Sequence, residues 1–380
     1  MRTSSSSRST STLRRLAAGL VGSGLVVLGA CGQDHAETRP LSGETLGVSS
    51  QELRANATYY VGAGTMAAKQ LALTFDDGPG TRTAALSTYL KSEGIRAVFF
   101  VNGACVQAPS LPGNSSCSPP TANAAAILAQ LAADGHLVAN HTTTHRNITS
   151  VPAGERVQEL SETNALMVAH GATPWNRSLF RAPFGAWSSA VHATLDASAM
   201  SHYVGPIYWD IGGDSDRYPA AAADWACFQG QLQNKGYATT TECGDAYRNE
   251  IDAVGRGIVL MHDPYGWAQG NTLDMVKYLV PLLKADGYTF VRADEIARIS
   301  ADLPACADAA CLDCSGGGAD QCTRCATGSY LAGGSCVPCT ACAAGTYPSA
   351  ACTATADTAC SACDASCSAC SGPTASECGA

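Results

Sequence analysis

The uneven distribution of cysteine is the feature that most constrains this chain of 380 residues. Fourteen of its 19 cysteines lie at or after Cys306. Most of them recur as Cys-x-x-Cys pairs with Gly, Ser, Thr and Ala between the pairs. Such pairs can bind zinc, but Gly-rich spacers at this cysteine density favour disulfides in an oxidising compartment. We therefore predict that residues 303–380 form a small disulfide-rich region.

The N-terminus agrees with an exported protein. Arg14-Arg15 precede an apolar run, from Leu16 to Ala30, that ends directly before Cys31. Small residues before a lone cysteine resemble a bacterial lipoprotein signal, in which the cysteine is acylated; an ordinary cleaved signal peptide is the alternative. We predict a signal peptide at 1–31 and a protein that is lipid-anchored to the bacterial cell envelope through Cys31, or secreted.

Polar residues with little periodicity follow, and residues 32–65 are predicted to be a flexible linker. The net charge is -9, and the chain has no basic stripe, which argues against nucleic acid as a partner. Hydrophobic residues make up 46% of the sequence, enough for a large core.

Residues 66–302 alternate short apolar runs with amphipathic segments, as repeated β/α units do. This pattern predicts an α/β fold, a (β/α) barrel that is distorted or lacks a strand. Strands are expected at 71–77, 97–101, 178–181, 202–211, 257–262 and 288–291 and in a segment ending at 140, and helices at 83–93, 124–133, 152–170 and 271–286. Two local disulfides, Cys105–Cys117 and Cys227–Cys243, are expected within this region.

The first polar cluster is Asp76-Asp77-Gly78-Pro79, which ends an apolar strand in a turn. Because neighbouring strand residues point to opposite sides, one carboxylate can bind a metal while the other accepts a proton. A solvated acidic turn is the alternative.

The second cluster is His141-Thr142-Thr143-Thr144-His145. Histidines at i and i+4 on one face of a helical turn can ligate one ion. The zinc-protease pattern would need Glu at position 142, so that class is disfavoured. Two histidines and a carboxylate would form a facial triad with open coordination positions.

Three more polar clusters are predicted at strand ends. They are Arg181-Ala182-Pro183-Phe184-Gly185, Trp209-Asp210-Ile211-Gly212-Gly213-Asp214 with the later Asp224-Trp225, and Leu260-Met261-His262-Asp263.

Together and in this order, the five clusters resemble the motifs of NodB-type polysaccharide deacetylases, carbohydrate esterase family four, over about residues 69–300. Four motifs stand intact. The fourth is altered, because the family's Asp-x-x-Asp-Trp is absent and an insertion separates Asp224-Trp225 from Asp210 and Asp214.

The resemblance implies a role for each motif. Asp77, His141 and His145 would hold a divalent metal, with zinc expected and cobalt or another ion as alternatives. Asp76 would be the general base, paired with Arg181, and His262 the general acid.

A backbone N–H near Phe184 would bind the oxyanion, and Trp209, Trp225 and Leu260 would line the acetyl pocket and sugar groove. Because the fourth motif is altered, we expect Asp210 or Asp214 to orient His262, with Trp225 returning to the groove.

The resemblance implies hydrolysis of N-acetyl groups on an N-acetylglucosamine-containing polysaccharide, such as chitin or peptidoglycan. Two alternatives remain: an O-acetyl xylan esterase of the same fold, and a non-catalytic glycan-binding lipoprotein. The segments Cys336–Cys360 and Cys363–Cys378 resemble tumour-necrosis-factor-receptor and furin-type repeats, which implies an adhesive or spacer module with a possible surface partner.

Overall fold

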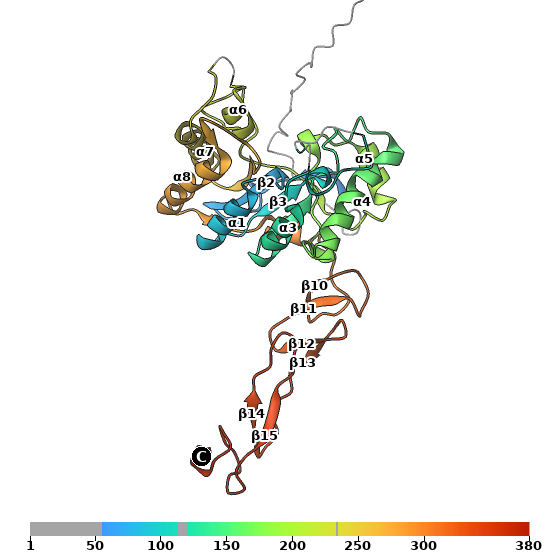
Figure 1. The fold of residues 1–380 in the computed structure, drawn as a ribbon, viewed down its shortest axis with the longest axis vertical. Coiled ribbons are helices and arrows are strands. Elements are labelled where there is room, and N and C mark those ends of the chain that lie inside the picture. The colour runs from blue at the N-terminus through green and yellow to red at the C-terminus, as the bar shows by residue number, and fades with distance from the viewer. Residues whose placement is uncertain (1–54, 113–116, 118–119, 233–234, 380) are drawn as a thin grey trace, which may run out of the picture. The chain divides into compact units, whose positions relative to one another are not determined.

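The computed structural model describes residues 55–112, 117, 120–232 and 235–379 (Figure 1). The predicted signal peptide, including Cys31, lies outside these residues. Within the described ranges, no helix is both long enough and apolar enough to cross a membrane.

A parallel sheet forms the centre of the first part of the chain. Its strand order is β4 (Leu137–Asn140), β3 (Val98–Val101), β2 (Gln70–Gly78) and β6 (Gly257–His262), and β9 (Thr289–Phe290) pairs with the start of β2. From Leu71 onward β2 is buried at every position, which explains its continuous apolar run before the two carboxylates.

Further parallel pairing closes this sheet into an irregular barrel. Single bridges join Asn140 to Phe180, Leu179 to Val204 and Ile211 to Val259, so that the last of them returns to β6. The segments predicted as strands at 178–181 and 202–211 contribute only these bridges and the short β5 (Gly205–Ile207). The predicted distorted barrel is confirmed.

Helices surround the barrel, with α7 and α8 on one side of the central strands and α4 and α5 on the other (Figure 1). Four helices lie where the sequence predicts them: α1 (Thr83–Ser92), α3 (Ala124–Ala133), α4 (Ala153–Ala169) and α8 (Thr272–Ala285). Five were not predicted: α2 (Gly103–Val106), α5 (Ser189–Asp196), α6 (Asp224–Gln229), α7 (Thr240–Val254) and α9 (Ala297–Ser300).

The predicted linker at 32–65 is wrong at its carboxyl end. Residues Ala55–Tyr60 form strand β1, which pairs in parallel with β5. The backbone N–H groups of Gly62 and Ala63 then donate to the Asp210 carboxylate at 2.8 and 3.1 Å. The folded part of the chain therefore begins no later than residue 55.

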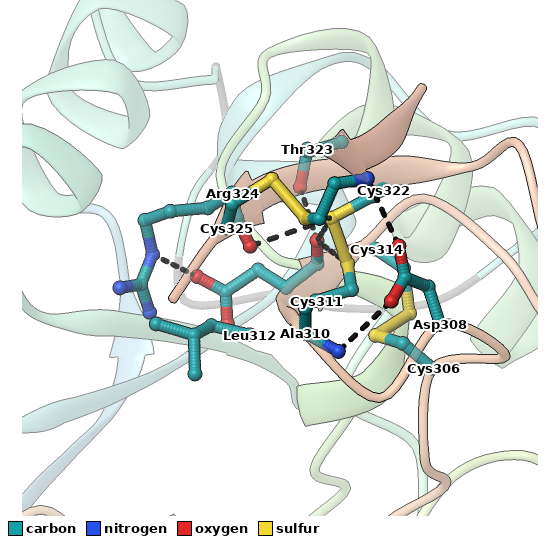
Figure 2. Close-up of a disulfide and its surroundings, with 12 residues drawn as sticks. Cys306, Asp308, Ala310, Cys311, Leu312, Cys314, Cys322, Thr323, Arg324 and Cys325 are labelled. Carbon is teal, nitrogen blue, oxygen red and sulfur yellow. Dashed lines mark hydrogen bonds and ion pairs between the residues drawn. A yellow bond between two sulfur atoms is a disulfide. The ribbon is translucent and has the colours of Figure 1, made fainter. Parts of the chain in front are cut away.

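The C-terminal region is held by disulfides, as predicted, and it also forms three short hairpins that were not predicted. The hairpins pair β10 (Cys311–Cys314) with β11 (Cys322–Cys325), β12 (Ser329–Ala332) with β13 (Ser335–Pro338), and β14 (Thr346–Ala350) with β15 (Ala359–Ala362). Figure 2 shows the first bridges, with Asp308 accepting a hydrogen bond from the backbone of Ala310.

All 18 cysteines in the described part of the chain are paired. The bridges are Cys105–Cys117 and Cys227–Cys243 in the barrel, then Cys306–Cys314, Cys311–Cys322, Cys325–Cys336, Cys339–Cys352, Cys342–Cys360, Cys363–Cys370 and Cys367–Cys378. The sulfurs of Cys311, Cys322 and Cys336 lie close together, but each belongs to a disulfide and offers no thiolate to a metal.

The first hairpin of this region contacts the barrel. Arg177 donates to Asp313 at 2.7 Å and to Asp294 at 2.8 Å. Asn176 donates to the Leu312 carbonyl at 3.0 Å and accepts from the Cys314 backbone at 3.1 Å. The hairpin is therefore hydrogen-bonded to the barrel as well as covalently joined to it.

Candidate active site

The two carboxylates at the end of β2 face the same group, contrary to the prediction that they point to opposite sides. Asp77 has a φ of 66°, and the pairing of β2 with β3 shifts register between Asp76 and Gly78. As a result Asp76 Oδ2 and Asp77 Oδ1 lie 3.6 and 3.5 Å from His141 Nε2. Both carboxylates can therefore serve one reaction centre.

His141 and His145 also meet, but not through the predicted helical turn. Residues 141–145 are non-helical, and Thr142 and His145 have φ values of 67° and 54°. The buried Glu159 carboxylate of α4 holds this turn by accepting from the backbone N–H groups of Thr143 and Thr144 at 3.0 and 2.9 Å. The two imidazole centroids lie 5.1 Å apart.

The donor atoms fit a small divalent metal. Asp77 Oδ1 lies 3.1 Å from His145 Nε2 and 3.5 Å from His141 Nε2. Ligands about 2.1 Å from a tetrahedral ion are about 3.4 Å from each other, so a common ion satisfies all three. His141 Nδ1 contacts the Arg181 carbonyl at 2.8 Å, which leaves Nε2 for the metal.

The charge states also suit a metal. Burial lowers the pKa of His141 to about 4, so its imidazole is neutral. Burial opposes ionisation of Asp77, but the adjacent His145 holds the pKa of that carboxyl well below its usual range. Neutral imidazole and ionised carboxylate are the forms that bind metal. Burial disfavours the imidazolium of His145, but the Asp77 carboxylate raises the pKa of His145, so this imidazole has to release its proton when a metal binds.

Arg181 pairs with Asp76, as predicted. Its Nη1 donates to Asp76 Oδ1 at 2.7 Å, and the guanidinium is completely buried. The guanidinium also donates to the Thr74 hydroxyl at 2.9 Å and to the carbonyls of Ile207 and Tyr208 at 3.0 and 3.1 Å. A buried cation with satisfied donors fixes the carboxylate beside it.

Asp224 is the carboxylate partner of His262, and the prediction of Asp210 or Asp214 is wrong. His262 Nδ1 lies 2.8 Å from Asp224 Oδ1, and the His262 backbone N–H donates to Asp224 Oδ2 at 2.6 Å. Burial disfavours the imidazolium, but the Asp224 carboxylate outweighs this and raises the pKa of His262 to about 9. His262 is therefore a protonated acid at neutral pH.

Asp210 and Asp214 have other surroundings. Asp210 is buried, and its carboxylate accepts backbone hydrogen bonds, among them that of Ile258 at 2.8 Å. Asp214 is half-buried, with a carboxylate oxygen 3.6 Å from Arg217.

One carboxylate holds the two ends of the inserted loop together. Glu250 Oε2 of α7 accepts from the backbones of Gly212 and Ala222, each at 3.0 Å. Because the loop is closed in this way, Asp224, the first residue of α6, lies next to His262.

Tyr265 is a site residue that the sequence reasoning missed. Its hydroxyl donates to Asp77 Oδ2 at 2.5 Å, and its ring stacks on the His262 ring with centroids 4.8 Å apart. Tyr265 therefore contacts both a candidate metal ligand and the candidate acid. In the sequence, only the position of Tyr265 three residues after His262 indicated that it could belong to the site.

Asp263 was also missed. It is buried beneath the turn that follows Asp77, where the Thr83 hydroxyl donates to its carboxylate. A Cβ built on Gly78 would lie 2.5 Å from the Asp263 carboxylate oxygens, so only glycine fits there. Burial raises the pKa of Asp263 to about 7.

The predicted substrate-binding residues are only partly brought together. Phe184 is 41% exposed and its ring packs edge-on against His145 at 4.7 Å. Leu260 is buried, and Trp209 stacks on Tyr208 at 4.0 Å. Trp225 is half-buried and packs against the main hydrophobic core. These positions leave Phe184 the most accessible of the four.

Comparison with known proteins agrees with this geometry. The family described as Polysaccharide deacetylase matches residues 63–201, which include β2, the two histidines and Arg181. The chain carries a polysaccharide deacetylase domain. It is a hydrolase domain, and its relatives are named as deacetylases.

Three relatives illustrate the range of the polysaccharide deacetylases. The chitin deacetylase of Colletotrichum lindemuthianum is 28% identical over 59% of this chain and 78% of its own length. The match to the solved structure of the Colletotrichum enzyme covers 61% of this chain and 88% of the chain in that structure, with a TM-score of 0.46 and 23% identity. A chitooligosaccharide deacetylase of Rhizobium leguminosarum bv. trifolii is 31% identical, over 38% of this chain and 57% of its own length. A bifunctional xylanase/xylan deacetylase of Cellvibrio japonicus is 30% identical, over 43% of this chain and 21% of its own length.

Proposed function

We propose that this chain removes N-acetyl groups from an N-acetylglucosamine-containing polysaccharide by metal-dependent hydrolysis. The observation that carries the proposal is the meeting of three groups at one end of the barrel. They are the Asp77–His141–His145 donor set, the Arg181–Asp76 pair, and the Asp224–His262 pair. Zinc is the ion we expect, because one carboxylate and two imidazoles suit it.

The residues divide the chemistry between them. A divalent metal held by the donor set supplies Lewis acidity toward water and the acetyl carbonyl. Asp76, kept in place by Arg181, accepts the proton of the attacking water. His262 donates a proton to the leaving nitrogen from Nε2, because Nδ1 faces Asp224. The amine then leaves neutral, which an amide requires.

The test is mass spectrometry of chitooligosaccharides and peptidoglycan fragments after incubation with the zinc- or cobalt-loaded chain. The expected result is the loss of acetyl groups with equal amounts of free amine and acetate. Chelation should abolish this activity and zinc or cobalt should restore it. The matched control is Asp76→Asn, which should keep the metal and lose most of the rate, whereas His141→Ala should lose the metal. Full activity in a thoroughly demetallated sample would refute the metal's role.

An O-acetyl esterase remains the second candidate, since one relative is named a xylan deacetylase. An alkoxide leaves more easily than an amide nitrogen, so an ester depends less on the acid His262. Release of acetate from acetylated xylan, with none from chitooligosaccharides, would favour this candidate. A non-catalytic glycan-binding protein is disfavoured, because the candidate ligands, base and acid are all present.

Export and lipid attachment at Cys31 remain part of the proposal and rest on the sequence alone. If Cys31 carries the lipid, Cys31→Ser should move the protein from the membrane fraction to the soluble one at unchanged specific activity. Persistence of the variant in the membrane fraction would refute attachment at this residue. The cysteine-rich region is proposed to bind a surface partner or to act as a spacer.

A further inference from the structure

Two aromatic side chains from distant segments meet at the surface of the barrel. Trp267 is 56% exposed and Tyr237 is 43% exposed. Their rings are nearly parallel, at 12°, with centroids 6.0 Å apart. Single exposed aromatics are ordinary, but a parallel exposed pair is an apolar surface that a ligand can cover.

Both side chains are carried by constrained segments. Trp267 belongs to the hairpin of β7 (Gly266–Trp267) and β8 (Gly270–Asn271). A Cβ on Gly270 would lie 2.6 Å from the Phe228 ring, so the hairpin packs closely on α6. Tyr237 lies in the segment closed by the Cys227–Cys243 disulfide, with its ring over Gly230.

The two residues that flank the hairpin contact residues of the active site. Tyr265, directly before it, donates to Asp77. Thr272, directly after it, donates to Asp224 Oδ2 at 2.8 Å, and its backbone N–H donates to the Tyr265 carbonyl at 3.2 Å. Trp267 is two residues beyond Tyr265, so its backbone lies within about 7 Å of a residue that contacts the metal-ligand set. That distance is comparable with the length of one sugar unit.

The chemistry of the pair matches a pyranose ring. A pyranose presents axial C–H groups on its faces and hydroxyl or acetamido groups at its rim. Trp and Tyr offer flat apolar surface, little side-chain entropy to lose, and a polar atom at the edge. Neither side chain carries a charge, so the pair offers no salt bridge to an anionic ligand.

On this basis we propose that Trp267 and Tyr237 form a stacking subsite for a sugar ring adjacent to the ring that is deacetylated. The ligand class is a polymer of N-acetylhexosamine, and the subsite makes the enzyme prefer longer chains. The inference rests on the proposed function, because it places the subsite beside that reaction centre.

The kinetic test compares KM for chitooligosaccharides of increasing length, from the dimer to the hexamer. Trp267→Ala should raise the ratio of KM for the longest to KM for the shortest substrate by roughly five- to tenfold. Trp267→Phe, which keeps an aromatic face, should restore most of the preference, and Tyr237→Ala should reduce it to a smaller extent. The matched control is Val168→Ala, an exposed apolar side chain on α4, which should change nothing. An unchanged length dependence in Trp267→Ala would overturn the proposal.

A binding measurement separates this proposal from the proposed function. In the Asp76→Asn background, calorimetry should show that chitohexaose binds roughly five- to tenfold more weakly once Trp267 is replaced by Ala. Absence of acetate release by the wild-type chain would refute the deacetylase function while this binding difference could still be measured. Equal binding with and without Trp267 would refute the subsite, whatever the activity.

Discussion

Replacing Asp224 by Asn tests the correction that the structure makes to the altered fourth motif. Asn keeps the size of the side chain but removes the charge that faces His262 Nδ1 at 2.8 Å. Raising the pKa of His262 from 6.5 to about 9 against burial corresponds to about 3 kcal/mol. Asp224 supplies the largest favourable part of this energy, so its loss should return the pKa to 6.5 or below.

The sign of the pH effect follows from the role of His262 as an acid. Activity requires the protonated imidazole and falls as pH rises through its pKa. A lower pKa therefore moves the alkaline limb of the kcat/KM profile to lower pH, by about 2.5 units or more. The maximal rate should fall by about 10²–10⁴-fold, because the acid is also less well oriented.

The assay is acetate release from a chitooligosaccharide as a function of pH, with circular dichroism to verify folding. Asp214→Asn is the control, because Asp214 is half-buried and 3.6 Å from Arg217 and should keep the wild-type profile. A folded Asp224→Asn variant with an unshifted alkaline limb would refute the assignment. A shifted limb in Asp214→Asn would restore the prediction made from the sequence.

Two other predictions concern Tyr265 and the cysteine-rich region. Tyr265→Phe removes the hydroxyl that donates to Asp77 Oδ2, so zinc affinity measured by chelator competition should fall about 10–100-fold; unchanged affinity would show that this hydrogen bond does not support the ligand. Truncation after Asp302 should keep turnover but lower the free energy of unfolding by about 2–3 kcal/mol, because Arg177 loses Asp313. Truncation after Pro338 retains that hairpin with its bridges and should leave the stability of the barrel unchanged in urea denaturation; equal stability of the two truncated chains would exclude the hairpin's contribution.

Much of the barrel could be predicted because its information is local. The strands β2, β3 and β6 and the helices α3, α4 and α8 follow from apolar runs and helical periodicity. Strand β1 was missed, since its pairing with β5 joins residues far apart in a polar-looking sequence. Helix α7 was missed because the prediction for this segment was limited to the Cys227–Cys243 disulfide, although Thr239 and Glu242 form a capping box at the start of the helix.

Most residues of the candidate site could be predicted from the sequence, but their spatial arrangement could not. The two histidines and Asp77 could be identified from recognisable motifs. Their side chains come together only because the backbone has positive φ angles and because Glu159 of α4 holds the turn that carries the histidines. The partner of His262 could not be assigned from spacing, because the inserted loop is closed by Glu250. Tertiary contacts decide whether Asp210 or Asp224 is the partner of His262.

The bridges of the cysteine-rich region have a consequence for how the chain matures. Their partners are separated by between 7 and 18 residues, and the same is true of the two bridges in the barrel. None of the 18 cysteines in the described residues has to wait for a distant partner, so each bridge can form as soon as a short length of chain meets oxidising conditions. Opening one bridge would leave most of this region cross-linked, because six of its seven bridges interlock in three overlapping pairs.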